Sequence, residues 1–202
     1  MSKRGFDFFF SALGLIFVLP LFLPIAFLIK IDSPGPVFFR QIRVGRYLRP
    51  FKIYKFRTMH ACISETGPSV SIAADPRVTR VGKVLRKYKL DELPQLMNVL
   101  VGDMSLVGPR PEVPKYVSAY DEKDKRIVYT VRPGITDEAS IAFRNESELL
   151  VKENDIDEFY VKKIIPIKLA YHRKYVGTHS LWLDFKIVLK TIWIILPFNS
   201  HK

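Results

Sequence analysis

The chain has 202 residues, a length that suits one domain with appendages and leaves little room for two independent cores. Its formal net charge of +12 predicts anionic partners: nucleic acid, anionic lipid or a phosphorylated substrate. The single cysteine, Cys62, excludes an internal disulfide and a cysteine-built zinc site, and the four scattered histidines point away from a histidine-built metal site.

The first element is the uncharged run at residues 8–29, which is long enough to span a bilayer. It lacks a small-residue cleavage site before Lys30, so we expect it to be retained rather than removed as a signal peptide. Pro20 and Pro24 predict a sharp break in its middle. Basic residues flank the run on both sides, which would hold both ends on the cytoplasmic face. Residues 1–31 are therefore predicted to form a re-entrant helix–break–helix anchor rather than a spanning helix.

Two short strands are predicted next, at residues 37–44 and 51–57, and the link between them would make a hairpin. Between Arg40 and Arg57 there are seven basic residues and no acidic ones. This basic face suits either lipid headgroups or a phosphate-bearing ligand, and composition does not separate the two.

Further along, turn residues predict a loop at 58–80 and a rigid turn at 131–136. A helix is predicted at 78–88 from its apolar face, and further helices at 116–128, which is polar and amphipathic, at 149–164, which is rich in acidic residues, and at 181–198. The last of these is rich in aromatic residues, so it suits an amphipathic helix in the headgroup region as well as a helix of the core.

The stretch from Arg86 to Pro111 combines cations, a carboxylate pair and an arginine held between two prolines. Its members in chain order are Arg86, Lys87, Lys89, Asp91, Glu92 and Pro109-Arg110-Pro111. Cations around a carboxylate pair would suit chemistry on a phosphate. A plainer interpretation makes Asp91 the N-cap of the apolar helix that follows and Glu92 a residue of its first turn. The two are compatible, because a helix N-terminus also binds phosphate.

Several motifs in order make the chain resemble the bacterial sugar transferase family, the monotopic polyprenyl-phosphate phosphoglycosyl transferases. They are KFRTM at 55–59, DPR at 75–77, LDELPQ at 90–95, GDMS at 102–105, VGPRP at 107–111 and VRPGIT at 131–136. The match covers nearly the whole chain, including the N-terminal apolar segment, and suggests the minimal single-domain form.

The resemblance implies a reaction and the residues for it. Family members move a phosphosugar from a UDP-sugar to polyprenyl (undecaprenyl) phosphate through a covalent aspartyl–phosphosugar intermediate, releasing UMP. Asp91 is the implied nucleophile and ligand of a magnesium ion, with Glu92 as its catalytic partner. The implied phosphate-binding residues are Arg86, Arg110 and Arg57, and Pro109 and Pro111 would position the Arg110 loop.

The resemblance also implies an α+β fold: a mainly helical, membrane-associated domain with a small β-hairpin, a re-entrant N-terminal helix and interfacial amphipathic helices. Residues 1–31 would be the anchor, and 32–202 a cytoplasmic catalytic domain with a membrane-surface segment at about 181–198. The expected location is the cytoplasmic face of the bacterial inner membrane, in the first membrane step of glycan assembly. The expected partners are the UDP-sugar, polyprenyl phosphate, membrane lipids and downstream glycosyltransferases, without nucleic acid, and a homodimer is left open.

The chain departs from the family pattern at two places, and two alternative functions stay open. After Thr136 many relatives continue Gly-Trp-Ala-Gln, whereas this chain has Asp137-Glu138-Ala139-Ser140, so the identity of the sugar is not predicted. Some relatives have Ser-Pro at the break of the anchor, where this chain has Leu23 before Pro24. One alternative function is a non-catalytic basic module that binds anionic lipid or nucleic acid at the membrane surface. The other is an enzyme that passes the phosphosugar directly, without a covalent step.

Overall fold

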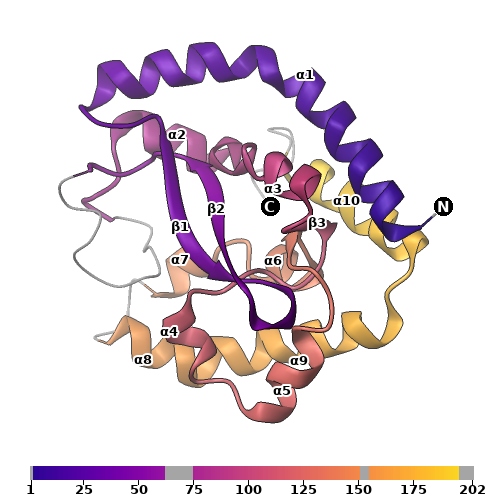
Figure 1. Cartoon of the computed structure of the whole chain (residues 1–202). Helices are drawn as coiled ribbons and strands as arrows, with labels where there is room; N and C mark the ends of the chain where they lie inside the picture. The colour runs from indigo at the N-terminus through magenta and orange to yellow at the C-terminus, as the bar shows by residue number, and fades with distance from the viewer. Residues whose placement is uncertain (1, 62–74, 151–154, 196–202) are drawn as a thin grey trace.

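Helices surround two small sheets in the computed structural model, which describes residues 2–61, 75–150 and 155–195 (Figure 1). This confirms the predicted α+β class. The helices are α1 (Lys3–Asp32), α2 (Arg80–Lys87), α3 (Gln95–Val101), α4 (Pro114–Val117), α5 (Glu122–Val128), α6 (Glu138–Ala142), α7 (Glu146–Leu149), α8 (Ile156–Phe159), α9 (Ile165–Thr178) and α10 (Leu181–Ile195). The strands are β1 (Phe38–Val44), β2 (Pro50–Phe56), β3 (Ser105–Val107) and β4 (Gly134–Thr136).

The N-terminal helix α1 runs without interruption through Pro20 and Pro24. It curves along one side of the molecule, as Figure 1 shows. The predicted division into two helices separated by a break is therefore wrong. Each proline removes one backbone donor, and a long helix accommodates that loss by bending.

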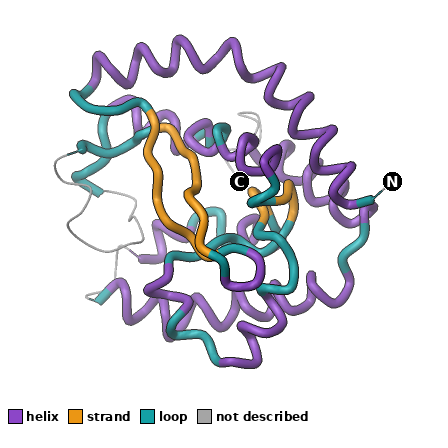
Figure 2. The backbone as a smooth tube through the Cα atoms, viewed as in Figure 1, coloured by secondary structure: helices purple, strands orange, loops and turns teal. Residues whose placement is uncertain are grey.

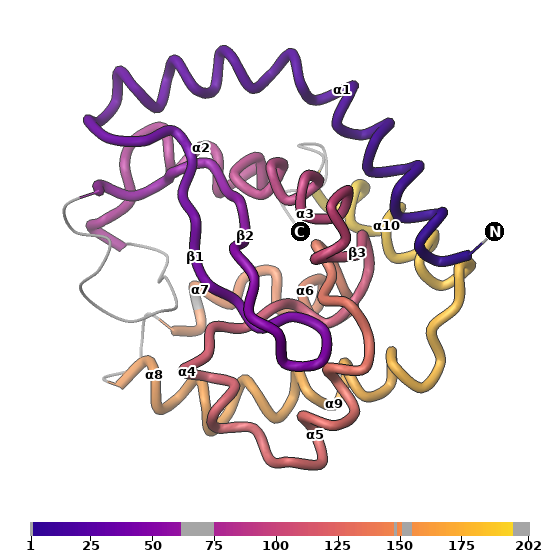
Figure 3. The backbone as a smooth tube through the Cα atoms, viewed as in Figure 1, coloured from indigo at the N-terminus to yellow at the C-terminus, as the bar shows by residue number. Residues whose placement is uncertain are grey.

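Both ends of α1 are fixed to the same globular body. At the start, Lys3 pairs with Asp184 of α10, and Arg4 donates to the carbonyl of Leu100 at 2.6 Å. At the far end, the Asp32 carboxylate accepts the backbone N–H of Val81 at 2.9 Å. Figure 3 shows the first turns of α1 beside α10 and its last turns above α2. The helix therefore lies along the domain over its whole length.

The outward side of α1 is almost entirely apolar. Its most apolar 18-residue window has a mean hydropathy of 2.7 and is only 11% buried, so length and composition would allow it to cross a membrane. The exposed large apolar side chains of α1 are Phe8, Phe9, Phe10, Leu13, Ile16, Phe17, Leu19, Leu21, Leu23, Phe27, Leu28 and Ile31. A continuous apolar face of this size is typical of a membrane or protein contact.

The predicted hairpin is confirmed: β1 and β2 pair antiparallel, with Phe38 opposite Phe56 and Val44 opposite Pro50. It crosses the front of the molecule, in orange in Figure 2. Phe56 is fully buried and its ring lies 4.9 Å from that of Phe22, measured between ring centroids. This aromatic contact fixes the open end of the hairpin against α1.

A second, parallel pair joins β3 to β4, with Ser105 opposite Gly134 and Val107 opposite Thr136. The rigid turn predicted at 131–136 is thus partly a strand. The backbones of the two segments approach closely, because a Cβ on Gly134, the first residue of β4, would lie 2.1 Å from the nitrogen of Gly108. A side chain has no room there, which accounts for glycine at this position.

The helix predicted at 78–88 is confirmed as α2, and two others are divided. Instead of one helix at 116–128 there are α4 and α5, because Asp121 caps α5 by accepting the N–H of Asp124 at 2.7 Å. Instead of one helix at 149–164, α8 begins after its own cap, Asp155, and continues through a π-helical turn (Tyr160–Ile164) into α9. Residues 151–154, and 62–74 of the predicted loop at 58–80, lie outside the described residues.

The C-terminal helix α10 has both features predicted for it, a side that packs in the core and an exposed aromatic side. Asp184 and Ile187 are buried against the domain. Trp182, Leu189 and Trp193 are at least half exposed on the other side. The helix is therefore both part of the packing around β3 and a source of exposed aromatic surface; residues 196–198 of the predicted segment lie outside the described residues.

Candidate active site

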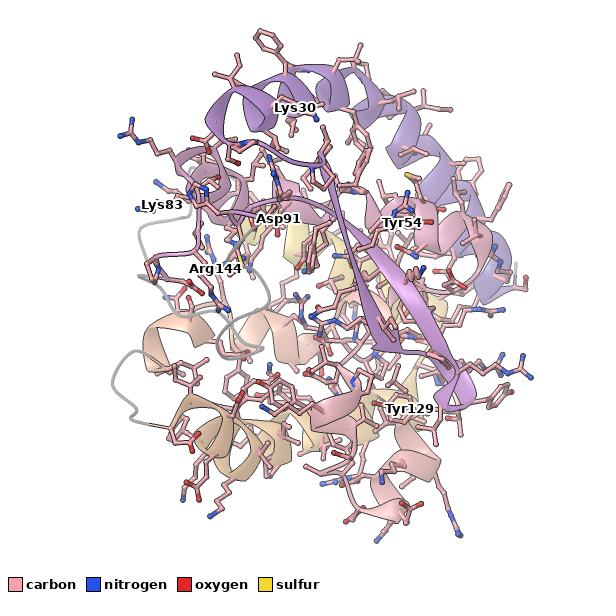
Figure 4. All side chains as sticks on the ribbon, turned by 60° about the vertical axis from the view of Figure 1, so that its left-hand side comes forward. Lys30, Tyr54, Lys83, Asp91, Tyr129 and Arg144 are labelled. Carbon is pink, nitrogen blue, oxygen red and sulfur yellow. The ribbon has the colours of Figure 1, made fainter. Side chains whose placement is uncertain are left out.

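Asp91 lies in a 3-10 turn, Leu90–Glu92, between α2 and α3, and it is 7% exposed. Figure 4 shows it well inside the outline of the molecule, below Lys30 of α1. The N-cap interpretation is wrong, because α3 begins after Pro94 and Asp91 caps no helix. Its Oδ1 has no hydrogen-bond partner among the described residues. A buried carboxylate oxygen without a partner is rare in a folded protein and indicates a place for a ligand.

Glu92, the other half of the carboxylate pair, is fully engaged. Arg110 binds it with both terminal nitrogens, Nη2 to Oε1 at 2.6 Å and Nη1 to Oε2 at 3.3 Å. Lys55 adds a third contact, Nζ to Oε1 at 2.8 Å. Burial opposes the ionisation of Glu92, but Arg110 and Lys55 outweigh it and hold the pKa of this carboxyl well below its usual range. Glu92 is thus a fixed anion that organises two cations.

The pKa values of the two neighbouring carboxyls, Asp91 and Glu92, shift in opposite directions. Burial raises the pKa of Asp91, and the adjacent Glu92 raises it further, while Lys55 and Arg86 favour the ionised form. Divergent pKa values in a carboxyl pair are a common mark of an active site, because the two groups then take different tasks.

Arg86, predicted to bind phosphate, comes from α2 and lies on the Asp91 side of the pair. Its Nε donates to Thr58 Oγ1 at 2.8 Å, which fixes the direction of the side chain. Burial lowers the pKa of Arg86, and Asp91 is the largest charge acting against that shift. An arginine remains a cation under such a shift, so Asp91 has a permanent positive neighbour.

Arg57 has a different set of partners. Its guanidinium donates to the carbonyls of Ser33 at 2.6 Å and Ile29 at 3.3 Å, and also to that of Pro34. These are the carbonyls at and just beyond the C-terminus of α1, which helix ends leave without intrahelical partners. Arg57 thus fixes the end of α1, and its part in phosphate binding stays a prediction.

The loop that carries Arg110 is held by its two prolines through their carbonyls. Pro109 accepts the N–H of Gly134 at 3.0 Å, and Pro111 accepts from Arg43 Nη1 at 3.1 Å. The prolines predicted to position this loop thus contribute both restricted backbone torsions and acceptors.

Lys55 was missed as a site residue by sequence reasoning, although it begins the KFRTM motif at 55–59. It is the largest positive influence on Asp91 and also pairs with Glu92, so it joins the two carboxyls electrostatically. The only signal in the sequence was an unexpected lysine among the apolar residues on one side of β2, alternating with Phe51 and Ile53.

The described residues offer the predicted magnesium ion one protein ligand, Asp91, and no larger ligand cluster. In the described ranges there is no group of three or more histidine, cysteine, aspartate or glutamate side chains that could hold a metal. The unpaired Oδ1 of Asp91 is a hard oxygen ligand, and magnesium is often held by one or two carboxylates together with substrate phosphates. Asp91 is therefore a suitable single protein ligand.

Comparison with known proteins gives the family. The family model described as "Bacterial sugar transferase" matches residues 1–197. The chain belongs to the bacterial sugar transferase family.

Three relatives of this sugar transferase illustrate the range of similarity. It is 43% identical over 196 residues to the UDP-N-acetylgalactosamine-undecaprenyl-phosphate N-acetylgalactosaminephosphotransferase of Aeromonas hydrophila, covering 96% of this chain and 43% of that protein. It is 42% identical over 205 residues to the UDP-glucose:undecaprenyl-phosphate glucose-1-phosphate transferase of Caulobacter vibrioides, covering 99% and 72%. It is 36% identical over 199 residues to the exopolysaccharide production protein PSS of Rhizobium leguminosarum, covering 94% and 92%. The chain thus spans less than half of the first relative and most of the other two.

Proposed function

We propose that this sugar transferase moves a phosphosugar from a UDP-sugar to undecaprenyl phosphate, releasing UMP, through a covalent intermediate on Asp91. The observation that carries the proposal is the buried Asp91 carboxylate, whose Oδ1 is unpaired while Lys55 and Arg86 favour its charged form. The names of two relatives support the substrate classes, since both are named for a UDP-sugar and undecaprenyl phosphate.

In the first step a carboxylate oxygen of Asp91 attacks the β-phosphorus of the donor. A new carboxylate–phosphorus bond forms while the bond from the β-phosphorus to the bridging oxygen breaks, and UMP leaves with that electron pair. In the second step an oxygen of undecaprenyl phosphate attacks the same phosphorus and restores the Asp91 carboxylate. Dividing the transfer in this way means that a soluble donor and a lipid acceptor never need to be bound together.

The main barrier is repulsion between an anionic nucleophile and an anionic diphosphate. Arg86, Lys55 and Arg110 together provide positive charge on both sides of the carboxylate pair, already oriented by Thr58 and Glu92. Such preorganised charge is the main means of catalysis in phosphoryl transfer. Asp91 would hold a magnesium ion, which supplies further neutralisation of the phosphate charge when bound.

The position of α1 supports a monotopic arrangement on the cytoplasmic face of the membrane. Because Lys3 and Asp32, near opposite ends of the helix, both bind the same domain, a spanning α1 would have to release one of these contacts. A helix that dips into the bilayer with its apolar face outward keeps both. It would also hold the catalytic carboxylate at the surface where the lipid phosphate is found.

Cysteine labelling tests this topology. In a Cys62→Ser background, Ser2→Cys and Pro36→Cys are both expected to react with a membrane-impermeant maleimide from the cytoplasmic side only. Phe17→Cys, at a position 73% exposed on the apolar face, is the control and should react only after detergent is added. Reaction of positions 2 and 36 from opposite sides would contradict the monotopic arrangement.

A donor panel tests the reaction itself. Detergent-solubilised protein incubated with UDP-sugars, magnesium and undecaprenyl phosphate is expected to release UMP with at least one sugar and to form a lipid-linked product. Absence of UMP release with every sugar would favour the non-catalytic basic module, which explains the net charge and the apolar ends but not the paired carboxylates.

A further inference from the structure

The backbone of the Arg110 loop has one unusual property. Pro109 and Pro111 have no N–H group, so the N–H of Arg110 is the only backbone donor in this tripeptide. It donates to Oδ2 of Asp137 at 3.2 Å. Asp137 is therefore the acceptor for the one N–H of a tripeptide whose proline carbonyls are held by Gly134 and Arg43.

Asp137 is itself firmly held. It is 2% exposed, and its Oδ1 accepts the N–H of Ser140 at 2.6 Å, which caps α6. Nε2 of His172, a buried residue of α9, lies 2.8 Å from Oδ2. Burial opposes the ionisation of Asp137, but His172 and Ser140 outweigh it and hold the pKa of this carboxyl at about 2. Asp137 is thus a buried anion that accepts two backbone N–H groups, of Ser140 and Arg110, and has the imidazole of His172 beside it.

The parallel pair of β3 and β4 brings Asp137 next to Arg110. Both segments leave the same end of this pair, since parallel strands point the same way. The N–H of Gly108 donates to the carbonyl of Thr136 at 3.1 Å, so the two chains stay in register up to the residue before Asp137. The side chain of Arg110 then turns to Glu92, while its backbone N–H turns to Asp137.

We propose that Asp137 and His172 are positioning residues: they fix the backbone of Arg110 and so direct its guanidinium at Glu92 and at the diphosphate of the donor. Neither residue touches the substrate. The inference rests on the proposed function, because it gives Arg110 a role in binding the donor. Without Asp137 the lone N–H of the loop loses its partner, and the guanidinium is no longer aimed.

A double-mutant cycle tests this coupling, with UDP as the probe in the presence of magnesium and binding measured by titration calorimetry. Arg110→Ala is expected to weaken UDP binding roughly 10- to 100-fold, and Asp137→Ala about 10-fold. Because Asp137 acts through Arg110, adding Asp137→Ala to Arg110→Ala should weaken binding by less than about 2-fold more. Full additivity of the two losses would overturn the inference while leaving the proposed function intact.

Two controls separate positioning from general stability. Asp121→Ala removes an equivalent aspartate cap, that of α5, and should leave UDP binding unchanged. At position 172, His172→Gln keeps an N–H donor and should bind UDP nearly as well as the unchanged protein, whereas His172→Leu should behave like Asp137→Ala. Equal behaviour of the two position-172 variants would overturn the part assigned to His172. Failure of the unchanged protein to bind UDP, or no effect of Arg110→Ala, would instead remove the donor-binding role on which the inference rests.

Discussion

Asp91→Asn is expected to abolish UMP release, by roughly 1000-fold or more, both with and without undecaprenyl phosphate. The amide is neutral and a poor nucleophile, so the first bond to phosphorus cannot form. Folding should be preserved or improved, because the variant removes a charge that is buried beside Glu92. A melting temperature equal to or above that of the unchanged protein would show that the loss concerns chemistry.

Intact-mass measurement gives the direct evidence for the covalent step. With the donor alone, the unchanged protein should gain the mass of the phosphosugar, and Asp91→Asn should gain nothing. Asp121→Asn makes the same chemical change at the cap of α5, which contacts neither carboxylate of the pair, and serves as the control. Full turnover by the Asp91 variant would mean that the phosphosugar passes directly from donor to acceptor.

Lys55→Met is expected to lower kcat/KM for UMP release about 100-fold or more, although Lys55 touches Glu92 rather than Asp91. Arg110 still holds Glu92, so the carboxylate pair keeps its geometry and loses a central positive charge. Burial raises the pKa of Asp91 and Lys55 is the strongest charge opposing that rise, so the pKa of Asp91 should rise further in the variant.

The direction of this pKa shift determines how the activity of Lys55→Met depends on pH. Asp91 must be ionised to attack, so activity is present above its pKa and is lost as the pH falls through it. Removal of Lys55 should move the acid limb of the pH–rate profile to higher pH. Lys52→Met changes the net charge equally on the same strand but concerns an exposed residue, and it should leave the profile unchanged. An unshifted acid limb in Lys55→Met would contradict the electrostatic role given to Lys55.

Local sequence signals were sufficient where a single element decides its own structure. The alternation at residues 51–57 identified β2, and the apolar spacing at 78–88 identified α2. The same approach failed where a cap lay inside a charged run, as at Asp121 and Asp155, because an aspartate that starts a helix looks like one more solvated charge. The three-residue strands β3 and β4 are too short to show a period of two.

The site itself was predicted in part. The resemblance selected Asp91, Glu92, Arg86 and Arg110, and the structure brings Glu92 and Arg110 together over a separation of 18 residues. Lys55 is 37 residues from Glu92, and no local pattern relates two such positions. These contacts depend on how the hairpin, the 3-10 turn and the parallel pair pack, which is information that only the folded chain contains.

The attachment of α1 at both ends has a practical consequence for anyone who wishes to work with a water-soluble version of this protein. Truncation before residue 33 would remove Lys3, the ion-pair partner of the buried Asp184, and the carbonyl of Ile29, which accepts from Arg57. It would also expose Leu85, which packs with Ile25 and Ile29. The first helix is thus a structural member of the folding unit and not a detachable tether. A soluble variant would have to keep the inner stripe of this helix and replace only its outer apolar side chains with polar ones.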